Sequence, residues 1–102
     1  MRKTNCKYRL KDDSGDYEFN ICEISDGWRA YIIFPDDNEY KRFDSSRKLG
    51  SVITHRLEDS IGQYICWTNS VQSYKAMRQI IKVWSEGTAK FIRTGVEFGG
   101  PA

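Results

Sequence analysis

The clearest pattern of hydrophobic and polar positions lies in the last third of the chain, between Ser70 and Thr94. At a step of about 100° per residue, one broad arc is hydrophobic and the opposite arc is polar and mostly basic. The hydrophobic arc holds Tyr74, Met77, Ile80, Ile81, Trp84, Phe91 and Ile92. Asn69, Ser70 and Ser73 are each able to cap a helix start, and Gly95 is a C-terminal stop signal. The pattern therefore predicts one long amphipathic helix from Ser70 to Thr94.

The first part of the chain alternates hydrophobic and polar residues with the period of a β-strand. The alternating runs occupy residues 6–10, 17–24 and 28–34. Turn residues separate them, including the Asp26-Gly27 dipeptide that is typical of hairpins. The last of these runs is the most hydrophobic, so we expect it at the centre of a sheet. Residues 40–43 are expected to form a short fourth strand, and the polar stretch 44–50 a surface loop.

A second hairpin is predicted from residues 52–58 and 63–68, although residues 51–58 are also compatible with a helix. Residues 96–98 could add a short segment after the long helix, and residues 99–102 are expected to form a flexible tail. Strands followed by one helix are typical of an α+β fold. We predict a single domain over residues 1–98, an antiparallel β-meander of four to six strands covered on one face by the C-terminal helix.

Length and composition narrow the function classes. A chain of 102 residues is the usual size for one domain with one core. Its formal net charge of +2 argues against a protein that simply coats nucleic acid. The three cysteines are far apart and odd in number, which is typical of reduced thiols. No hydrophobic run reaches the length of a membrane span, and no targeting segment is evident. These features predict a cytoplasmic protein with reduced thiols and no membrane association.

Two catalytic or metal-binding constellations are conceivable from the residue types. Cys6, Cys22, His55 and Cys66 could supply a tetrahedral zinc site, but they lack the closely spaced ligand pairs of structural zinc sites. Cys66 and His55, oriented by Asp59, could form a Cys-His nucleophile, but no known local signature surrounds Cys66. We therefore expect buried structural cysteines, no catalytic residues, no metal and no cofactor.

Basic residues form three groups on the predicted elements. The polar face of the helix carries Lys75, Arg78, Lys82, Lys90 and Arg93, with Glu86 as its single acid. The outer face of the first strand includes Lys7 and Arg9, and a third group follows the third strand: Lys41, Arg42, Arg47 and Lys48. Like charges at helical spacing repel one another. The helix face is thus either a binding surface for a negatively charged partner or an ordinary solvated surface.

About half of the chain resembles the arm-binding domains of tyrosine integrases, which are DNA-binding modules with a three-stranded sheet and a helix. The matching segments are Asp26-Gly27-Trp28-Arg29-Ala30-Tyr31, a polar turn at 35–39, Tyr40-Lys41-Arg42-Phe43, and a Ser-capped helix that begins Tyr74-Lys75-Ala76. In those domains the sheet enters the major groove. The resemblance implies DNA binding through the sheet.

From the residues we expect a small non-catalytic binding module, most simply a protein-binding inhibitor that acts by occlusion. Tyr, Trp and Arg, which dominate interface hot spots, are plentiful here. Small inhibitors carried by phages and mobile elements, anti-CRISPR proteins among them, have a similar size and a similar lack of motifs. The expected partner is a protein with an acidic, nucleic-acid-mimicking or nucleoprotein surface. The alternative is nucleic-acid binding through the basic residues. The sequence does not decide whether the protein forms a homodimer.

Overall fold

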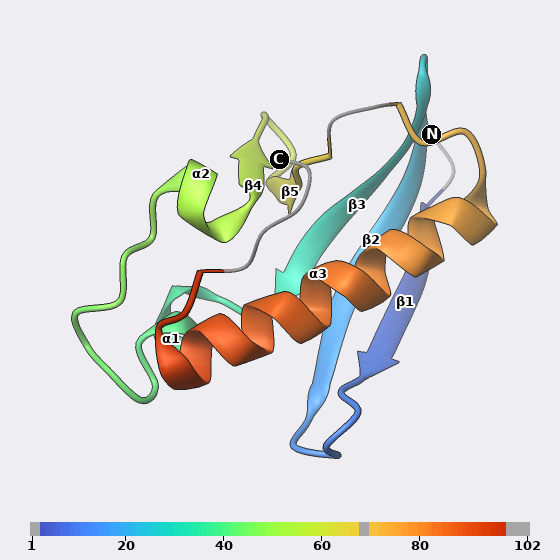
Figure 1. The fold of residues 1–102 in the computed structure, drawn as a ribbon. Helices are drawn as coiled ribbons and strands as arrows, with labels where there is room; N and C mark the ends of the chain where they lie inside the picture. The colour runs from blue at the N-terminus through green and yellow to red at the C-terminus, as the bar shows by residue number, and fades with distance from the viewer. Residues whose placement is uncertain (1–2, 68–69, 98–102) are drawn as a thin grey trace.

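The computed structural model describes residues 3–67 and 70–97, and one long helix crosses one face of a five-stranded antiparallel sheet (Figure 1). The strands are β1 (Lys3–Arg9), β2 (Asp16–Ile24), β3 (Gly27–Phe34), β4 (Arg56–Glu58) and β5 (Gln63–Ile65). The helices are α1 (Asp37–Tyr40), α2 (Ser51–Thr54) and α3 (Tyr74–Thr94). The predicted α+β class, with an antiparallel sheet and one long C-terminal helix as its cover, is confirmed.

The strands lie in the order β1-β2-β3-β5-β4, so β3 is central, as its hydrophobic sequence predicts. β1 and β2 pair without interruption from Lys3 opposite Cys22 to Arg9 opposite Asp16. In contrast, β3 and β5 pair at one position, Tyr31 opposite Tyr64. The sheet therefore consists of a long three-stranded part and a short hairpin attached to it, and β1 forms one free edge.

The core lies between the sheet and α3, and Trp84 is at its centre. Only 1% of Trp84 is exposed, which confirms its predicted place in the core. Its ring meets the edge of Phe19 on β2 at a centroid distance of 5.8 Å. Its indole N–H donates to the carbonyls of Thr54 and His55, at 3.2 Å each. One side chain thus holds α3, β2 and the C-terminal end of α2 together.

The predicted helix is correct except for its first turn. Ser73 is the cap, since its hydroxyl accepts from the amide of Ala76 at 3.0 Å, and Gly95 ends the helix with a φ of 76°. Residues before Ser73 are held away from helical geometry because the carbonyl of Val71 accepts from the amide of Trp28 at 2.8 Å. A Cβ at Gly27 would lie 2.3 Å from that carbonyl, so this close approach requires glycine.

The predicted fourth strand at residues 40–43 is wrong. The short helix α1 ends at Tyr40, and residues 41–43 lie in neither a helix nor a strand. Asp36 caps α1 by accepting from the amide of Glu39 at 2.9 Å. Tyr40 is then fully buried, with its ring 6.3 Å from that of Phe91 on α3. Local capping and one buried aromatic side chain outweigh the strand preference of a four-residue run.

The ambiguous segment 51–58 contains both predicted structures, because α2 is followed directly by β4. His55 separates them with a left-handed conformation, at φ 53° and ψ 43°. The expected hairpin with the next strand is confirmed, but β4 and β5 are shorter than the predicted 52–58 and 63–68. Residues 96 and 97 form no strand, while Phe98 and the predicted tail at 99–102 lie outside the described residues.

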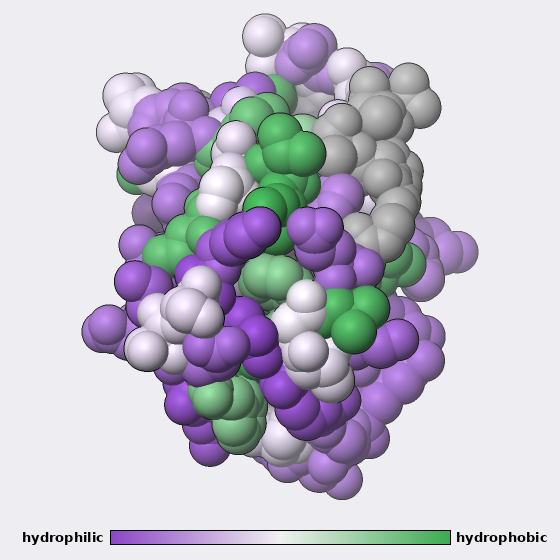
Figure 2. Space-filling model, turned by 60° about the vertical axis from the view of Figure 1, so that its left-hand side comes forward, coloured by the Kyte–Doolittle hydropathy of each residue, from purple (hydrophilic) through white to green (hydrophobic). Residues whose placement is uncertain are grey.

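The side of the molecule that carries α2 is mainly hydrophilic, with small hydrophobic patches between polar residues (Figure 2). Val52 on α2 is one of the exposed hydrophobic residues, at 78% exposure. Scattered hydrophobic residues of this kind are common on protein surfaces. None of the helices in the described part of the chain is long and apolar enough to cross a membrane.

Candidate basic groove

The basic face of α3 divides into two halves with different surroundings. All five of its predicted cations are exposed: Lys75, Arg78, Lys82, Lys90 and Arg93. In the C-terminal half, Arg93 forms an ion pair with Asp12 at 2.9 Å. Glu86, which lies between the two halves, turns toward β1 and accepts hydrogen bonds from the Tyr8 hydroxyl at 2.6 Å and the Lys11 amide at 3.0 Å. Asp12 therefore offsets the charge of Arg93, whereas Lys90 forms no ion pair with any described residue.

The cations of the N-terminal half, Lys75, Arg78 and Lys82, form no ion pair with any described residue. The first turn of α3 also contains no acid. Because the N-terminus of a helix carries a partial positive charge, a lysine in this turn is unfavourable for the isolated helix. This half of the face is a surface of uncompensated positive charge.

These three cations line a groove of about 260 Å³ between α3 and β1. Cys6, Lys7 and Tyr8 form the strand side of the groove, and Lys75, Arg78, Gln79, Ile81 and Lys82 form the helix side. The groove exists because α3 runs obliquely across the sheet and its first turns reach past β1 (Figure 1). A free sheet edge and a cationic helix face thus meet in one concave surface, which we call the basic groove.

Tyr8 and Glu86 close the groove toward the C-terminal half of α3. The Tyr8 hydroxyl donates to Glu86, and burial and this hydrogen bond raise the pKa of Tyr8 to about 12. The helical pattern places Glu86 among the basic residues. Its contact with Tyr8 joins positions 78 residues apart in the chain, so no local signal indicates it.

The three predicted basic groups do not form one surface. Lys7 lies on the basic groove, whereas Arg9 forms an ion pair with Asp16 at 2.6 Å. Arg47 donates to the carbonyl of Ile92 at 3.1 Å, which places the third group beside the last turn of α3. At about 1.5 Å of rise per residue, that turn lies about 25 Å from the first.

Within the third group the side chains have separate roles. Arg47 binds a C-terminal carbonyl of α3 and pairs with Asp44 at 3.2 Å, so it stabilises the helix end. Arg42 pairs with Glu39 at 3.4 Å. Lys41 and Lys48 are exposed and have no ion pair within the described residues. Lys41 and Lys48 are therefore useful reference positions for charge changes in the basic groove.

The candidate nucleophile is only partly assembled. The amide of Cys66 donates to the carbonyl of His55 at 2.8 Å, so the predicted hairpin does bring these residues together. Burial raises the pKa of the Cys66 thiol, which disfavours the nucleophilic thiolate. Asp59 instead accepts from Tyr31 at 2.6 Å and from Arg29 at 2.9 Å. It therefore fastens the β4–β5 hairpin to β3.

The candidate zinc ligands do not converge. Cys6 and Cys22 are buried, Cys66 is partly buried, and all three are free thiols. Within residues 3–67 and 70–97, no three histidine, cysteine or acidic side chains lie close enough together to hold a metal ion.

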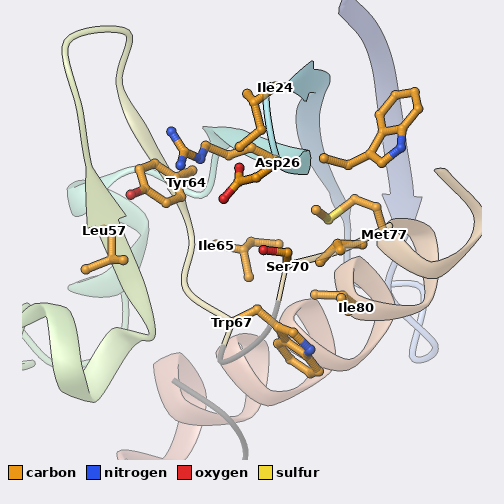
Figure 3. A pocket seen from close by; sticks show the side chains of 12 residues that line it. Ile24, Asp26, Leu57, Tyr64, Ile65, Trp67, Ser70, Met77 and Ile80 are labelled. Carbon is orange, nitrogen blue, oxygen red and sulfur yellow. The ribbon is translucent and has the colours of Figure 1, made fainter. Parts of the chain in front are cut away.

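A second cavity of about 240 Å³ lies where β3 and β5 diverge (Figure 3). Leu57, Tyr64 and Ile65 from the hairpin, Met77 and Ile80 from α3, and Ile24 and Trp67 contribute side chains to it. Arg29 also lines it, with its guanidinium 4.1 Å from the ring centre of Tyr64. Strand alternation places Arg29 and Tyr31 on one face of β3, but no sequence signal indicates that the hairpin would leave this gap.

The basic groove is the better candidate site, because its three helix cations form no ion pair with any described residue and its lining comes from both α3 and β1. No protein-family model, curated protein or solved structure matches this chain, so its function has to be inferred from the residues of the groove and their surroundings.

Proposed function

We propose that the protein is a non-catalytic binding module that docks an acidic surface of a partner protein in the basic groove and acts by occluding that surface. The observation that supports this proposal is the uncompensated charge of Lys75, Arg78 and Lys82. Elsewhere on α3 and β1, Arg93 and Arg9 have acidic partners. Keeping like charges together on one helix face costs stability, and an acidic partner would remove that cost.

A protein partner agrees better with the groove than DNA binding through the sheet does. On the sheet face opposite α3, Glu18 accepts from Asn5 at 2.8 Å, and Arg9 is paired with Asp16. Acidic side chains on this face would repel phosphates. DNA binding by the sheet, as the likeness to integrase arm-binding domains implies, stays a prediction.

The proposal is tested by changing charge in the basic groove and at a distant site. The groove variant combines Lys75→Glu, Arg78→Glu and Lys82→Glu, and the control variant combines Lys41→Glu and Lys48→Glu. Each protein is immobilised and used for quantitative affinity capture from a nuclease-treated bacterial lysate. We expect an acidic protein that the wild type and the control retain and the groove variant loses.

Two results would contradict the proposal: equal capture by the groove variant and the wild type, or capture of nucleic acid alone before nuclease treatment. Nucleic-acid binding is measured separately by fluorescence anisotropy with short DNA and RNA at two salt concentrations. Phosphate binding releases counterions, so a steep linear fall of log K with log salt would identify nucleic acid as the ligand.

A further inference from the structure

The outer edge of β1 has backbone groups available for another strand. Leu10 donates its amide to the carbonyl of Gly15 at 3.0 Å, which directs this amide toward the β2 side. Because hydrogen-bonded and non-hydrogen-bonded pairs alternate in an antiparallel ladder, the N–H and C=O groups of Asn5, Lys7 and Arg9 point the other way. No hydrogen bond joins these amides to any residue within 3–67 and 70–97.

The middle one of these three residues, Lys7, lies on the basic groove beneath the first turns of α3. An added strand would lie about 4.8 Å beyond β1. Alternate side chains of that strand would face α3, where Lys75, Arg78 and Lys82 line the groove. The other side chains would lie beside those of Asn5, Lys7 and Arg9. The α3 side of the added strand would therefore meet unpaired positive charge, while its other side would meet Lys7 between Asn5 and the Arg9–Asp16 ion pair.

We propose that the basic groove binds an extended acidic segment of a partner protein by β-strand addition to β1. This inference rests on the proposed function and specifies the form of the ligand. Main-chain hydrogen bonds to a sheet edge supply affinity in this mode of recognition, and the flanking side chains supply specificity. A second copy of the chain is a poor occupant, because pairing β1 with itself would bring Lys3, Lys7 and Arg9 against like charges.

The sharpest protein variant is Lys7→Pro, with Lys7→Ala as its matched control. Both changes remove the same charge, but only proline removes the outward N–H of residue 7. Proline is tolerated on an edge strand where its nitrogen faces away from the sheet. The probe is a fluorescein-labelled ten-residue peptide that alternates glutamate and valine, titrated by anisotropy at physiological ionic strength. We expect Lys7→Pro to bind this peptide at least tenfold more weakly than Lys7→Ala.

Backbone-methylated peptides test the same point without changing the protein. In one peptide every glutamate amide is N-methylated, and in the other every valine amide is N-methylated. Only one of the two sets would point at β1 in an added strand. We expect one peptide to lose binding at least tenfold and the other to bind like the parent. This pair of peptides also decides the question if the melting temperature shows that Lys7→Pro does not fold.

The outcomes separate this inference from the proposed function. If the Lys75, Arg78 and Lys82 reversal abolishes peptide binding while Lys7→Pro and Lys7→Ala bind equally, the groove binds acids without strand addition. The inference is then wrong and the proposed function stands. If the reversal leaves peptide binding unchanged, both are wrong. A concentration-dependent dimer of the free protein that Lys7→Pro disrupts would assign the edge to a second copy instead.

Discussion

At the scale of single residues, Trp84 connects more of the structure than any other side chain described above. It packs against Phe19 and Tyr17 of β2, and its N–H is satisfied by two carbonyls next to α2. Removing it would leave both a cavity and two carbonyls without this donor.

We expect Trp84→Ala to lower the free energy of unfolding by about 3–5 kcal/mol, a large part of the roughly 5–15 kcal/mol of a typical domain. Val83→Ala is the control, because Val83 is the preceding helix residue and is 54% exposed. Urea unfolding of both variants measures the difference. A loss below about 1 kcal/mol for Trp84→Ala would mean that the core does not depend on this side chain.

Asp59 is the second residue with a testable role. Its carboxylate accepts hydrogen bonds from Tyr31, from the amides of Ile61 and Gly62, and from Arg29, and these lower the pKa of Asp59. A carboxyl group with a lowered folded pKa contributes stability that is present above its unfolded pKa of about 4. This contribution is lost as the pH falls through the folded pKa.

Asp59→Asn is therefore expected to lower the melting temperature at pH 7, and the difference from the wild type should shrink as the pH falls below about 4. The control is Glu23→Gln, since Glu23 is exposed and has no ion pair among the described residues. Thermal unfolding of both variants across this pH range measures the effect. A difference that is independent of pH would show that the Asp59 carboxylate is not the stabilising group.

At the scale of elements, the start of α3 depends on one hydroxyl. Ser73 accepts from the amide of Ala76, while the nearby Ser70 lies before the helix and is exposed. Replacing an N-cap serine by alanine typically costs about 1 kcal/mol.

We expect Ser73→Ala to destabilise the protein by about 1 kcal/mol and Ser70→Ala by less than about 0.5 kcal/mol, measured by urea unfolding. Equal effects of the two changes would place the helix start nearer to Ser70 than the structure does.

At the scale of the whole molecule, the basic groove concentrates positive charge on one side of a nearly neutral protein. Arg78 and Lys82 are exposed, so the combined change Arg78→Glu and Lys82→Glu should alter the free energy of unfolding by less than about 0.5 kcal/mol. A small gain is reasonable because the like-charge repulsion is relieved. Melting temperature and oligomeric state are measured together. Unfolding of this variant would show that these side chains are buried in an interface between copies.

The sequence by itself determined the elements whose signals are local. The long amphipathic period, the capping serines and Gly95 identify α3, and strand alternation identifies β1, β2 and β3. Trp84 as a core residue follows from the same periodicity. These predictions succeed because the periodicity of a helix or a strand is set by residues close together in the sequence, within one or two helical turns or a few strand positions. At 37–40 and 51–54 the local signals were too short or ambiguous to predict α1 and α2.

Only the tertiary structure decided which parts of the basic sequence form a site. Sheet order makes β1 an edge, and the oblique path of α3 brings Lys75, Arg78 and Lys82 beside it. The hydrogen bond from the Lys11 amide to the Glu86 carboxylate joins residues 75 positions apart. The ion pair between Asp12 and Arg93 spans a similar separation. Such contacts depend on how whole elements pack. Helical periodicity therefore predicts a basic face, whereas packing decides which cations of that face line a groove beside β1.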